Sequence, residues 1–182
     1  MLLLDGQKEG LDLLIEMFAG FGVHTPRAAS TAEEAKTLTR DREINLFVVD
    51  SALGDTDGYQ FIRWLRRSGV TPNCFAPALL LIGHTKRSQV LKARDCGANF
   101  VVSKPITPLV MLQRIIWTTK ENRAFVESPG YCGPDRRFRA LGPPVGEKGR
   151  RSGDLPPEVG KATEPNLDQS DIDALFGARK AG

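Results

Sequence analysis

Short, uninterrupted apolar runs alternate with longer amphipathic segments over the first 120 residues of this 182-residue chain. Such continuous runs are typical of strands that are buried on both faces of a sheet. They lie at residues 2–5, 44–50, 78–82 and 99–102, with a weaker one at 23–28. Between them, apolar side chains recur at helical spacing, so each intervening segment has one apolar face. Strands that alternate with helices five times predict an α/β fold, with a parallel sheet covered by helices on both faces.

Three charged side chains follow strands of this predicted sheet. Asp5 closes the first strand, Asp50 the third and Lys104 the fifth. An Asp in such a place can simply cap the next helix. In open parallel sheets, however, sites lie beyond the carboxyl ends of the strands. Converging carboxylates suit a divalent cation such as Mg²⁺, and a lysine beside them suits a phosphoryl group.

These residues carry a resemblance to the CheY-like receiver domains of bacterial response regulators. The matching motifs are Val48-Val49-Asp50, Gly54-Asp55-Thr56-Asp57-Gly58, Cys96-Gly97-Ala98 and Lys104-Pro105. The resemblance spans residues 1–122 and implies a (βα)5, flavodoxin-like, doubly wound sheet. It also implies that Asp50 is the phosphoacceptor, that Lys104 contacts the phosphoryl group, and that the Lys104-Pro105 bond is cis. Mg²⁺ would be held by Asp5, Asp50 and the backbone carbonyl of Ala52.

Three positions depart from the family pattern. Gly6 stands where the family has a second acid, Ile82 where it has a switch Thr or Ser, and Val101 where it has an aromatic residue. Fewer charged ligands should weaken Mg²⁺ binding. Without the switch residues, phosphorylation should change the conformation of the domain little. Two interpretations stay open: a receiver that answers to another signal, or a phosphoacceptor regulator served by a histidine kinase. We expect a signalling protein and not an enzyme, although self-phosphorylation chemistry would make the second interpretation weakly enzymatic.

The formal net charge of +3 is the sum of three unlike parts. Residues 1–119 carry +2, residues 120–151 carry +4 and residues 152–182 carry −3. Residues 128–165 hold 7 Pro and 7 Gly, which is typical of irregular segments. We therefore predict four parts: a receiver domain at 1–122, a largely irregular arginine-rich extension at 123–165, a short acidic helix at 166–177 and a tail at 178–182.

Arginine outnumbers lysine in the extension, in two clusters that each contain an aspartate. An arginine fork binds phosphate bidentately and matches the O6 and N7 edge of guanine, a carboxylate accepts from the opposite guanine edge, and an aromatic ring can stack on the base. Cyclic di-GMP, which has two guanines and two phosphates, would use such a motif twice. The candidate ligand residues are Tyr131, Asp135, Arg136, Arg137, Phe138, Arg139, Arg150, Arg151 and Asp154, with Lys120 and Arg123 nearby.

A resemblance supports this hypothesis. Arg151-Ser152-Gly153-Asp154 is similar to the Arg-x-x-Asp motif of inhibitory cyclic di-GMP sites in diguanylate cyclases, and the chain resembles a group of CheY-like proteins whose arginine-rich extensions answer to cyclic di-GMP. A plain linker with solvated arginines is the alternative. Nucleic acid ranks below a small nucleotide, because +4 over 32 residues gives little affinity by counterion release.

The acidic end predicts a short helix, with Ser170 and Asp173 as a capping box and one apolar face. The segment is similar to the amino-terminal peptide of flagellar switch proteins, to which chemotaxis receivers bind. We expect it to occupy the chain's own output face in competition with the motor peptide, or to bind another receiver in trans. Permanent packing on its own receiver, or simple fraying, is the alternative. The candidate partner-binding residues are Gln169, Ile172, Leu175 and Phe176.

Several classes of protein are disfavoured by composition. No apolar stretch approaches the ~20 residues that a membrane span needs, and the run Met1–Leu4 meets Asp5 at once, so we expect no signal peptide. Three cysteines share no metal-ligand spacing, which favours reduced thiols. We therefore expect a cytoplasmic protein, recruited under the motor hypothesis to the flagellar motor or a cell pole.

Overall fold

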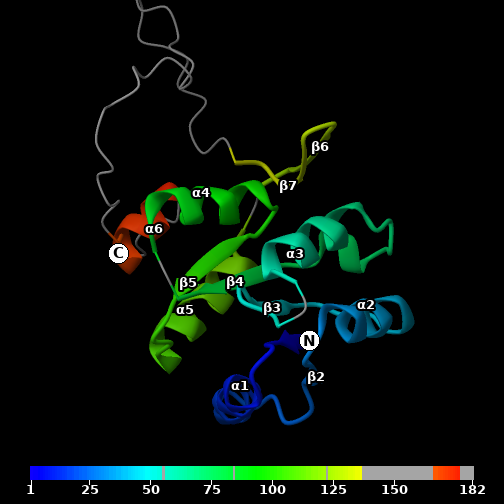
Figure 1. Ribbon diagram of the computed structural model, residues 1–182, viewed down its shortest axis with the longest axis vertical. Coiled ribbons are helices and arrows are strands. Elements are labelled where there is room, and N and C mark those ends of the chain that lie inside the picture. Colours follow the sequence, from blue (N-terminus) through cyan, green and yellow to red (C-terminus); the bar gives the residue numbers. More distant parts are fainter. Residues whose placement is uncertain (55, 84, 122, 137–165, 177–182) are drawn as a thin grey trace, which may run out of the picture.

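The computed structural model describes residues 1–54, 56–83, 85–121, 123–136 and 166–176. Five parallel strands form one sheet in the order β2-β1-β3-β4-β5 (Figure 1). All residues of β1, β3 and β4 are buried, which explains why their sequences are apolar runs without alternation. The strands are β1 (Leu2–Leu4), β2 (Arg27–Ala29), β3 (Phe47–Asp50), β4 (Ala78–Ile82) and β5 (Phe100–Ser103).

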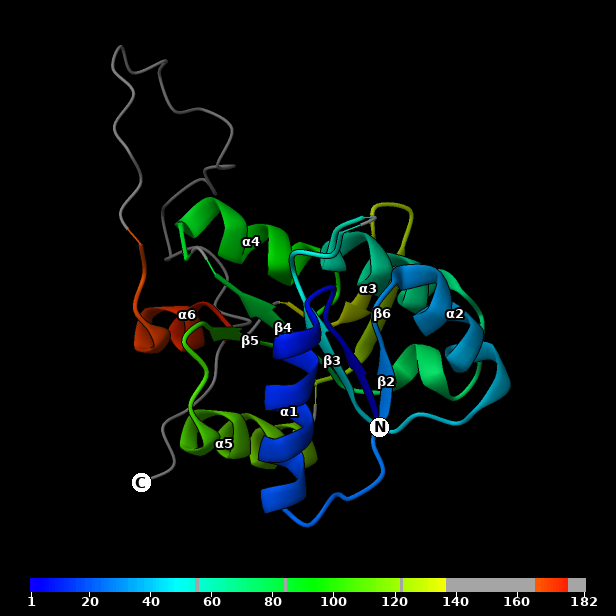
Figure 2. The ribbon, with the colours of Figure 1, turned by 60° about the horizontal axis from the view of Figure 1, so that its bottom comes forward.

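Five helices connect and cover these strands, with α1 and α5 over one face of the sheet and α2, α3 and α4 over the other (Figure 2). The predicted doubly wound α/β fold is therefore confirmed. None of the helices in the described parts of the chain is long and apolar enough to span a membrane. The helices are α1 (Lys8–Gly20), α2 (Ala32–Asp41), α3 (Gly58–Arg67), α4 (Arg87–Asp95) and α5 (Pro108–Thr119).

The junction between β3 and α3 is unusually tight. A Cβ atom on Gly58 would lie 2.0 Å from the backbone oxygen of Asp50, so only glycine lets the helix begin against the strand end. Asp57 caps this helix by accepting from the amide of Gln60 at 2.7 Å. The same carboxylate forms an ion pair with Lys92 of α4 at 3.2 Å. These contacts fix the loop that follows Asp50, the last residue of β3.

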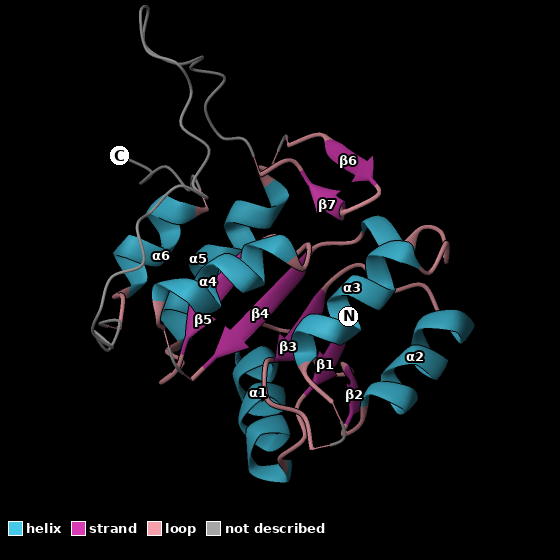
Figure 3. Ribbon diagram, turned by 45° about the horizontal axis from the view of Figure 1, so that its top comes forward, coloured by secondary structure: helices cyan, strands magenta, loops and turns pink. Residues whose placement is uncertain are grey.

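The first part of the extension is a hairpin, although the abundance of Pro and Gly predicted an irregular backbone from residue 123. Strand β6 (Phe125–Ser128) pairs with β7 (Tyr131–Pro134) in antiparallel register, and all four residues of β7 are buried (Figure 3). Pro129 and Gly130 supply the turn between the two strands. In this part of the extension, Pro and Gly residues therefore form the hairpin turn and allow the hairpin to pack closely on the receiver.

The hairpin packs on α3 through glycine and a buried arginine. A Cβ on Gly97, whose φ is +98°, would lie 2.6 Å from the carbonyl oxygen of Cys132. Beneath it, Arg66 of α3 is only 3% exposed and donates to the carbonyl oxygens of Cys74, Ala76 and Gly97 and to the Asn99 side chain. Burial lowers the pKa of Arg66 to about 10, so it stays charged at neutral pH. Arg66 therefore joins α3 to the segments that precede β4 and β5, and its carbonyl oxygen accepts from the Cys132 thiol of the hairpin at 3.1 Å.

The acidic segment forms helix α6 (Gln169–Leu175), which packs beside β5, the edge strand of the sheet (Figure 1). The predicted capping box is wrong. Asp168 is the N-cap and accepts from the amide of Asp171 at 2.8 Å, while Ser170 lies inside the helix and Asp173 turns toward the receiver. Two side-chain acceptors, Asp168 and Ser170, lie near the start of this helix, and Asp is as good an N-cap as Ser. The sequence pattern therefore favoured the wrong one of the two.

Candidate functional site

The three charged residues at the strand ends meet, as the sequence predicted. Asp5 is 2% exposed and Asp50 is 3% exposed. The ammonium group of Lys104 forms an ion pair with the Asp50 carboxylate and lies 3.7 Å from Oδ2 of Asp5. The other carboxylate oxygens accept backbone N–H bonds, from Gln7 to Asp5 at 2.9 Å and from Ala52 to Asp50 at 2.7 Å. The Lys104-Pro105 bond is cis, as expected.

Charge is only partly balanced in this cluster. Burial raises the pKa of Asp5, and the negative charge of Asp50 adds to the rise, while the Gln7 amide and Lys104 oppose it. The two carboxylates are of the kind of donor that Mg²⁺ prefers, as is the Ala52 carbonyl that the resemblance assigns to the site. Within the described residues, no three His, Cys, Asp or Glu side chains form a group that could hold a metal ion. The donors therefore fit Mg²⁺ in kind but fall short in number.

The structure gives a reason for the missing second acid. A Cβ on Gly6 would lie 2.9 Å from the backbone nitrogen of Gly54 and 3.2 Å from the Cα of Leu53. The loop after β3 therefore occupies the space that a side chain at position 6 would enter. The two other departures lie in the core, because Ile82 and Val101 are each 1% exposed.

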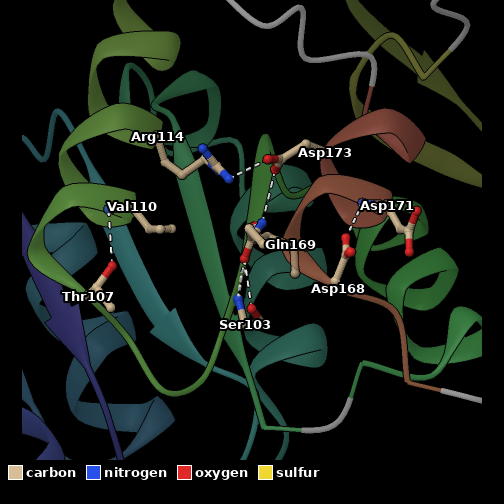
Figure 4. Close-up of polar contacts among 9 residues, drawn as sticks. Ser103, Thr107, Val110, Arg114, Asp168, Gln169, Asp171 and Asp173 are labelled. Atoms are coloured by element: carbon tan, nitrogen blue, oxygen red, sulfur yellow. Dashed lines mark hydrogen bonds and ion pairs between the residues drawn. The ribbon is translucent and has the colours of Figure 1, made fainter.

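Helix α6 covers the outer edge of β5 through one glutamine (Figure 4). Oε1 of Gln169 accepts from the backbone amide of Ser103 at 2.8 Å and from its hydroxyl at 2.9 Å. Nε2 of Gln169 donates to the carbonyl oxygen of Val101 at 3.0 Å. The carboxamide thus satisfies one donor and one acceptor of the edge strand, as a neighbouring strand would.

A buried ion pair and two apolar side chains complete the contact. Asp173 pairs with Arg114 of α5 (Figure 4). The Arg114 side chain is 2% exposed and stacks on Trp117, with 4.2 Å between the guanidinium carbon and the ring centroid. Ile172 is 0% and Phe176 1% exposed. Burial raises the pKa of Asp173 and lowers that of Arg114, and each partner opposes the shift of the other.

The predicted partner-binding residues are therefore brought together on the receiver. Gln169 hydrogen-bonds to β5, Ile172 and Phe176 join the buried core, and Leu175 is partly buried and packs against that core. Sequence reasoning missed Arg114 of α5, which pairs with Asp173 of α6. Its signal was visible, because Arg114 is the one charged residue within α5.

The structure places the first three of the predicted ligand residues. Arg136 stacks on Tyr131, with 4.4 Å between the guanidinium carbon and the ring centroid, and pairs with Asp95 at 2.5 Å. Asp135 is tied to the start of the hairpin, since its amide donates to the carbonyl oxygen of Ala124 at 2.7 Å. The remaining predicted ligand residues lie outside the described residues: Arg137, Phe138, Arg139, Arg150, Arg151 and Asp154.

Around Arg136 lies a pocket of about 390 Å³. Its walls include Arg63 and Arg67 of α3, which the sequence did not single out. Arg123, expected to join this site, instead donates to the carbonyl oxygen of Asn99 at 2.8 Å and pairs with Glu121. It therefore holds the segment after α5.

Comparison with known proteins agrees with the fold. The family model described as the response regulator receiver domain matches residues 1–116. Transcriptional regulatory protein GltR of Pseudomonas aeruginosa is 29% identical over 117 residues, which are 63% of this chain and 46% of GltR. Response regulator PleD of Caulobacter vibrioides is 29% identical over 92 residues, which are 50% of this chain and 20% of PleD. The chain thus spans less than half the length of these curated relatives.

Solved structures show the same fold. The receiver domain of NtrX from Brucella abortus superposes with a TM-score of 0.59 at 20% identity, covering 66% of this chain and 98% of that one. Chemotaxis protein CheY4 of Vibrio cholerae gives a TM-score of 0.58 at 18% identity, with coverages of 64% and 94%. At such identities the likeness concerns the fold alone.

Proposed function

The chain belongs to the response regulator receiver family, and on this premise we propose that it binds cyclic di-GMP through its arginine-rich extension and regulates the flagellar motor by protein docking. The observation that carries the proposal is the position of α6. This helix resembles the switch-protein peptide and lies against β5 and α5 of its own receiver. In the proposed mechanism, α6 competes with the motor peptide for this surface until the nucleotide releases it.

The contacts of α6 suit a reversible occupant. The helix has seven residues, and a helix this short is marginal in water unless it docks on a surface. The segment is held on the receiver by two buried apolar side chains, one glutamine, a backbone hydrogen bond from Leu167 to Thr85 at 2.8 Å and one ion pair whose desolvation offsets part of its attraction. In the proposed mechanism, a competing peptide or a ligand replaces these contacts.

The position of the arginine clusters supports a role for the nucleotide. They lie in sequence between the hairpin on α3 and helix α6. A ligand that gathers both clusters therefore acts on the segment that leads to α6. Arg136 and Tyr131 already present a stacked guanidinium and ring at the start of this segment.

Two measurements test the proposal. First, deletion of residues 166–182 should raise the affinity for a labelled switch-protein peptide, whereas Asp171→Ala, at an exposed position of α6, should leave it near the wild-type value. An unchanged affinity after the deletion argues against self-docking. Second, calorimetry should show binding of cyclic di-GMP that is lost when Arg136→Ala and Arg137→Ala are combined. If the wild type gives no heat of binding, cyclic di-GMP is not the ligand.

A second candidate function rests on the strand-end cluster. Asp5, Asp50 and Lys104 lie together as a phosphoacceptor site requires. In this alternative, Asp50 accepts a phosphoryl group from a histidine kinase and Lys104 contacts it. Asp5, Asp50 and the Ala52 carbonyl would hold Mg²⁺, which supplies positive charge for the phosphoryl oxygens. Labelling by acetyl phosphate that is lost in Asp50→Asn and accompanied by a shape change would favour this alternative.

A further inference from the structure

A pocket of about 390 Å³ opens where α3 and α4 end and the β6–β7 hairpin packs on them. Its volume falls in the range of roughly 300–1,000 Å³ that small-molecule sites occupy. Arg63 and Arg67 line it from α3, and Arg136 and Tyr131 line it from the hairpin side. Asp95, the last residue of α4, completes this set. The pocket thus joins residues of the receiver to the first residues of the extension.

The walls of the pocket carry net positive charge. Three arginines face one aspartate, Asp95, which leaves two uncompensated positive charges. The two thiols in the wall do not reduce this charge. Burial raises the pKa of Cys96 to about 12 and also raises that of Cys132, so both are neutral at physiological pH. Such a pocket favours an anion.

The two arginines of α3 are placed to act together. Arg63 and Arg67 are one helical turn apart, and both side chains are exposed. One N–H group of Arg67 donates to the carbonyl oxygen of Pro129 at 3.1 Å, so this side chain also contacts the hairpin turn. Each guanidinium has five N–H donors, so both retain donors for a shared phosphate.

The opposite wall has groups of the kinds that can contact a guanine base. The guanidinium of Arg136 lies over the ring of Tyr131 at 4.4 Å, and its Nη1 donates to Oδ1 of Asp95 at 2.5 Å. The same oxygen also accepts from Nε of Arg94 at 3.2 Å. An arginine donates to the acceptor edge of guanine, a carboxylate accepts from the N1–H and amino group, and a flat base stacks on a guanidinium plane. Arg136, Asp95 and Tyr131 therefore offer these three kinds of contact within one pocket.

From this combination we infer that the pocket binds one guanine nucleotide half of the ligand, with its phosphate on Arg63 and Arg67 and its base at Arg136 and Asp95. The inference rests on the proposed binding of cyclic di-GMP and extends the site from the extension to the receiver itself. The assignment concerns only this pocket, whose lining residues come from α3, the end of α4 and the hairpin side.

Calorimetry on the full chain tests the assignment. Arg63→Ala should weaken binding of cyclic di-GMP by about tenfold or more, since a hydrogen bond to a charged group is lost. Arg67→Lys, which keeps the charge but loses the fork, should weaken binding less. Arg27→Ala is the matched control, because Arg27 is an exposed arginine on β2, at the opposite edge of the sheet. It should bind like the wild type.

Amide chemical shifts give a readout that does not depend on a variant. Adding cyclic di-GMP to the labelled wild-type chain should shift the amides of Arg63, Arg67 and Gly130 more than those of α1. GMP should compete weakly for the same amides. Cyclic di-AMP, which lacks the guanine N1–H and amino donors, should not compete, and equal binding would overturn the contact assigned to Asp95.

The two possible failures are distinguishable. If the wild type gives neither heat nor chemical-shift changes with cyclic di-GMP, the proposed ligand is wrong and so is its assignment to this pocket. If the wild type binds but Arg63→Ala binds equally well and the amides of Gly130 and Arg63 do not shift, only the pocket is wrong. Binding would then belong to the extension alone. Unchanged melting temperatures of the variants exclude a loss of folding as the cause.

Discussion

Gln169 bridges the outer edge of the sheet by accepting from the amide and the hydroxyl of Ser103, at 2.8 and 2.9 Å, while it donates to the carbonyl oxygen of Val101 at 3.0 Å. Edge strands expose unpaired backbone groups that readily pair with another chain. A single carboxamide here occupies one such pair on β5. The surface that a docking partner would use is therefore covered at its backbone as well as at its side chains.

Replacement of this glutamine should loosen α6. Gln169→Ala removes three hydrogen bonds to the receiver, and we expect docking to weaken by about 1–3 kcal/mol, because two partly buried backbone groups lose a partner. Amide hydrogen exchange at Ile172 should accelerate accordingly. Ser170→Ala, at an exposed position of the same helix, is the control and should leave exchange unchanged. Equal exchange in both variants would show that the carboxamide contributes nothing to docking.

Docking of α6 should depend on pH through Asp173. Burial raises its pKa, and the hydrogen bond from Gln169 and the charge of Arg114 only partly oppose the rise, while Asp168 adds to it. A carboxyl group whose pKa is higher when docked than when free binds its proton more tightly in the docked state. This extra stabilisation is present below the ordinary pKa of about 3.9 and is lost as the pH rises through the docked value. We therefore expect α6 to dock more tightly in mild acid than at neutral pH.

An NMR titration of the Asp173 carboxyl carbon in the full chain measures this pKa directly. Arg114→Gln should raise it further, because a neighbouring positive charge favours the ionised carboxylate. An Asp173 pKa at or below the ordinary value would contradict the expected pH dependence.

The fold was largely predictable, because it depends on local patterns that the sequence displays. Buried parallel strands must be apolar throughout, and Asp57 and Thr107 cap helices as their residue types predict. The meeting of Asp5, Asp50 and Lys104 followed from the rule that parallel strands share one carboxyl edge.

The contacts of the segments after α5 were not predictable, because they join residues far apart in sequence. Nothing near Gln169 indicates Ser103 as its partner, and nothing near Arg136 indicates Asp95 as its partner. The hairpin was missed for a different reason. Composition counts Pro129 and Gly133 as signs of irregularity, whereas the first supplies a turn and the second a close approach to Gly97.

Adding a second acid at position 6 should not restore a strong Mg²⁺ site at the strand ends. Gly6→Asp would supply the acid that the family pattern has, yet its Cβ would meet the backbone of Leu53 and Gly54. We expect the free energy of unfolding to fall by about 1–3 kcal/mol and Mg²⁺ affinity to rise little. Urea unfolding with and without Mg²⁺ measures both quantities. Tight Mg²⁺ binding without loss of stability would show that the loop after β3 moves freely.

The hairpin should depend on a single glycine of the receiver. Gly97 has a φ of +98°, which L side chains rarely adopt, and its Cβ would lie 2.6 Å from the Cys132 carbonyl oxygen and 2.9 Å from the Cγ of Arg66. Gly97→Ala should therefore lower the free energy of unfolding by about 1–3 kcal/mol and displace β7 from α3. Gly20→Ala, at a helical position where nothing lies within 4 Å, is the control and should be neutral or stabilising. Because β7 forms one wall of the arginine-lined pocket, Gly97→Ala should also weaken nucleotide binding in calorimetry. If the stability falls while nucleotide binding stays at the wild-type level, the hairpin does not shape the ligand site.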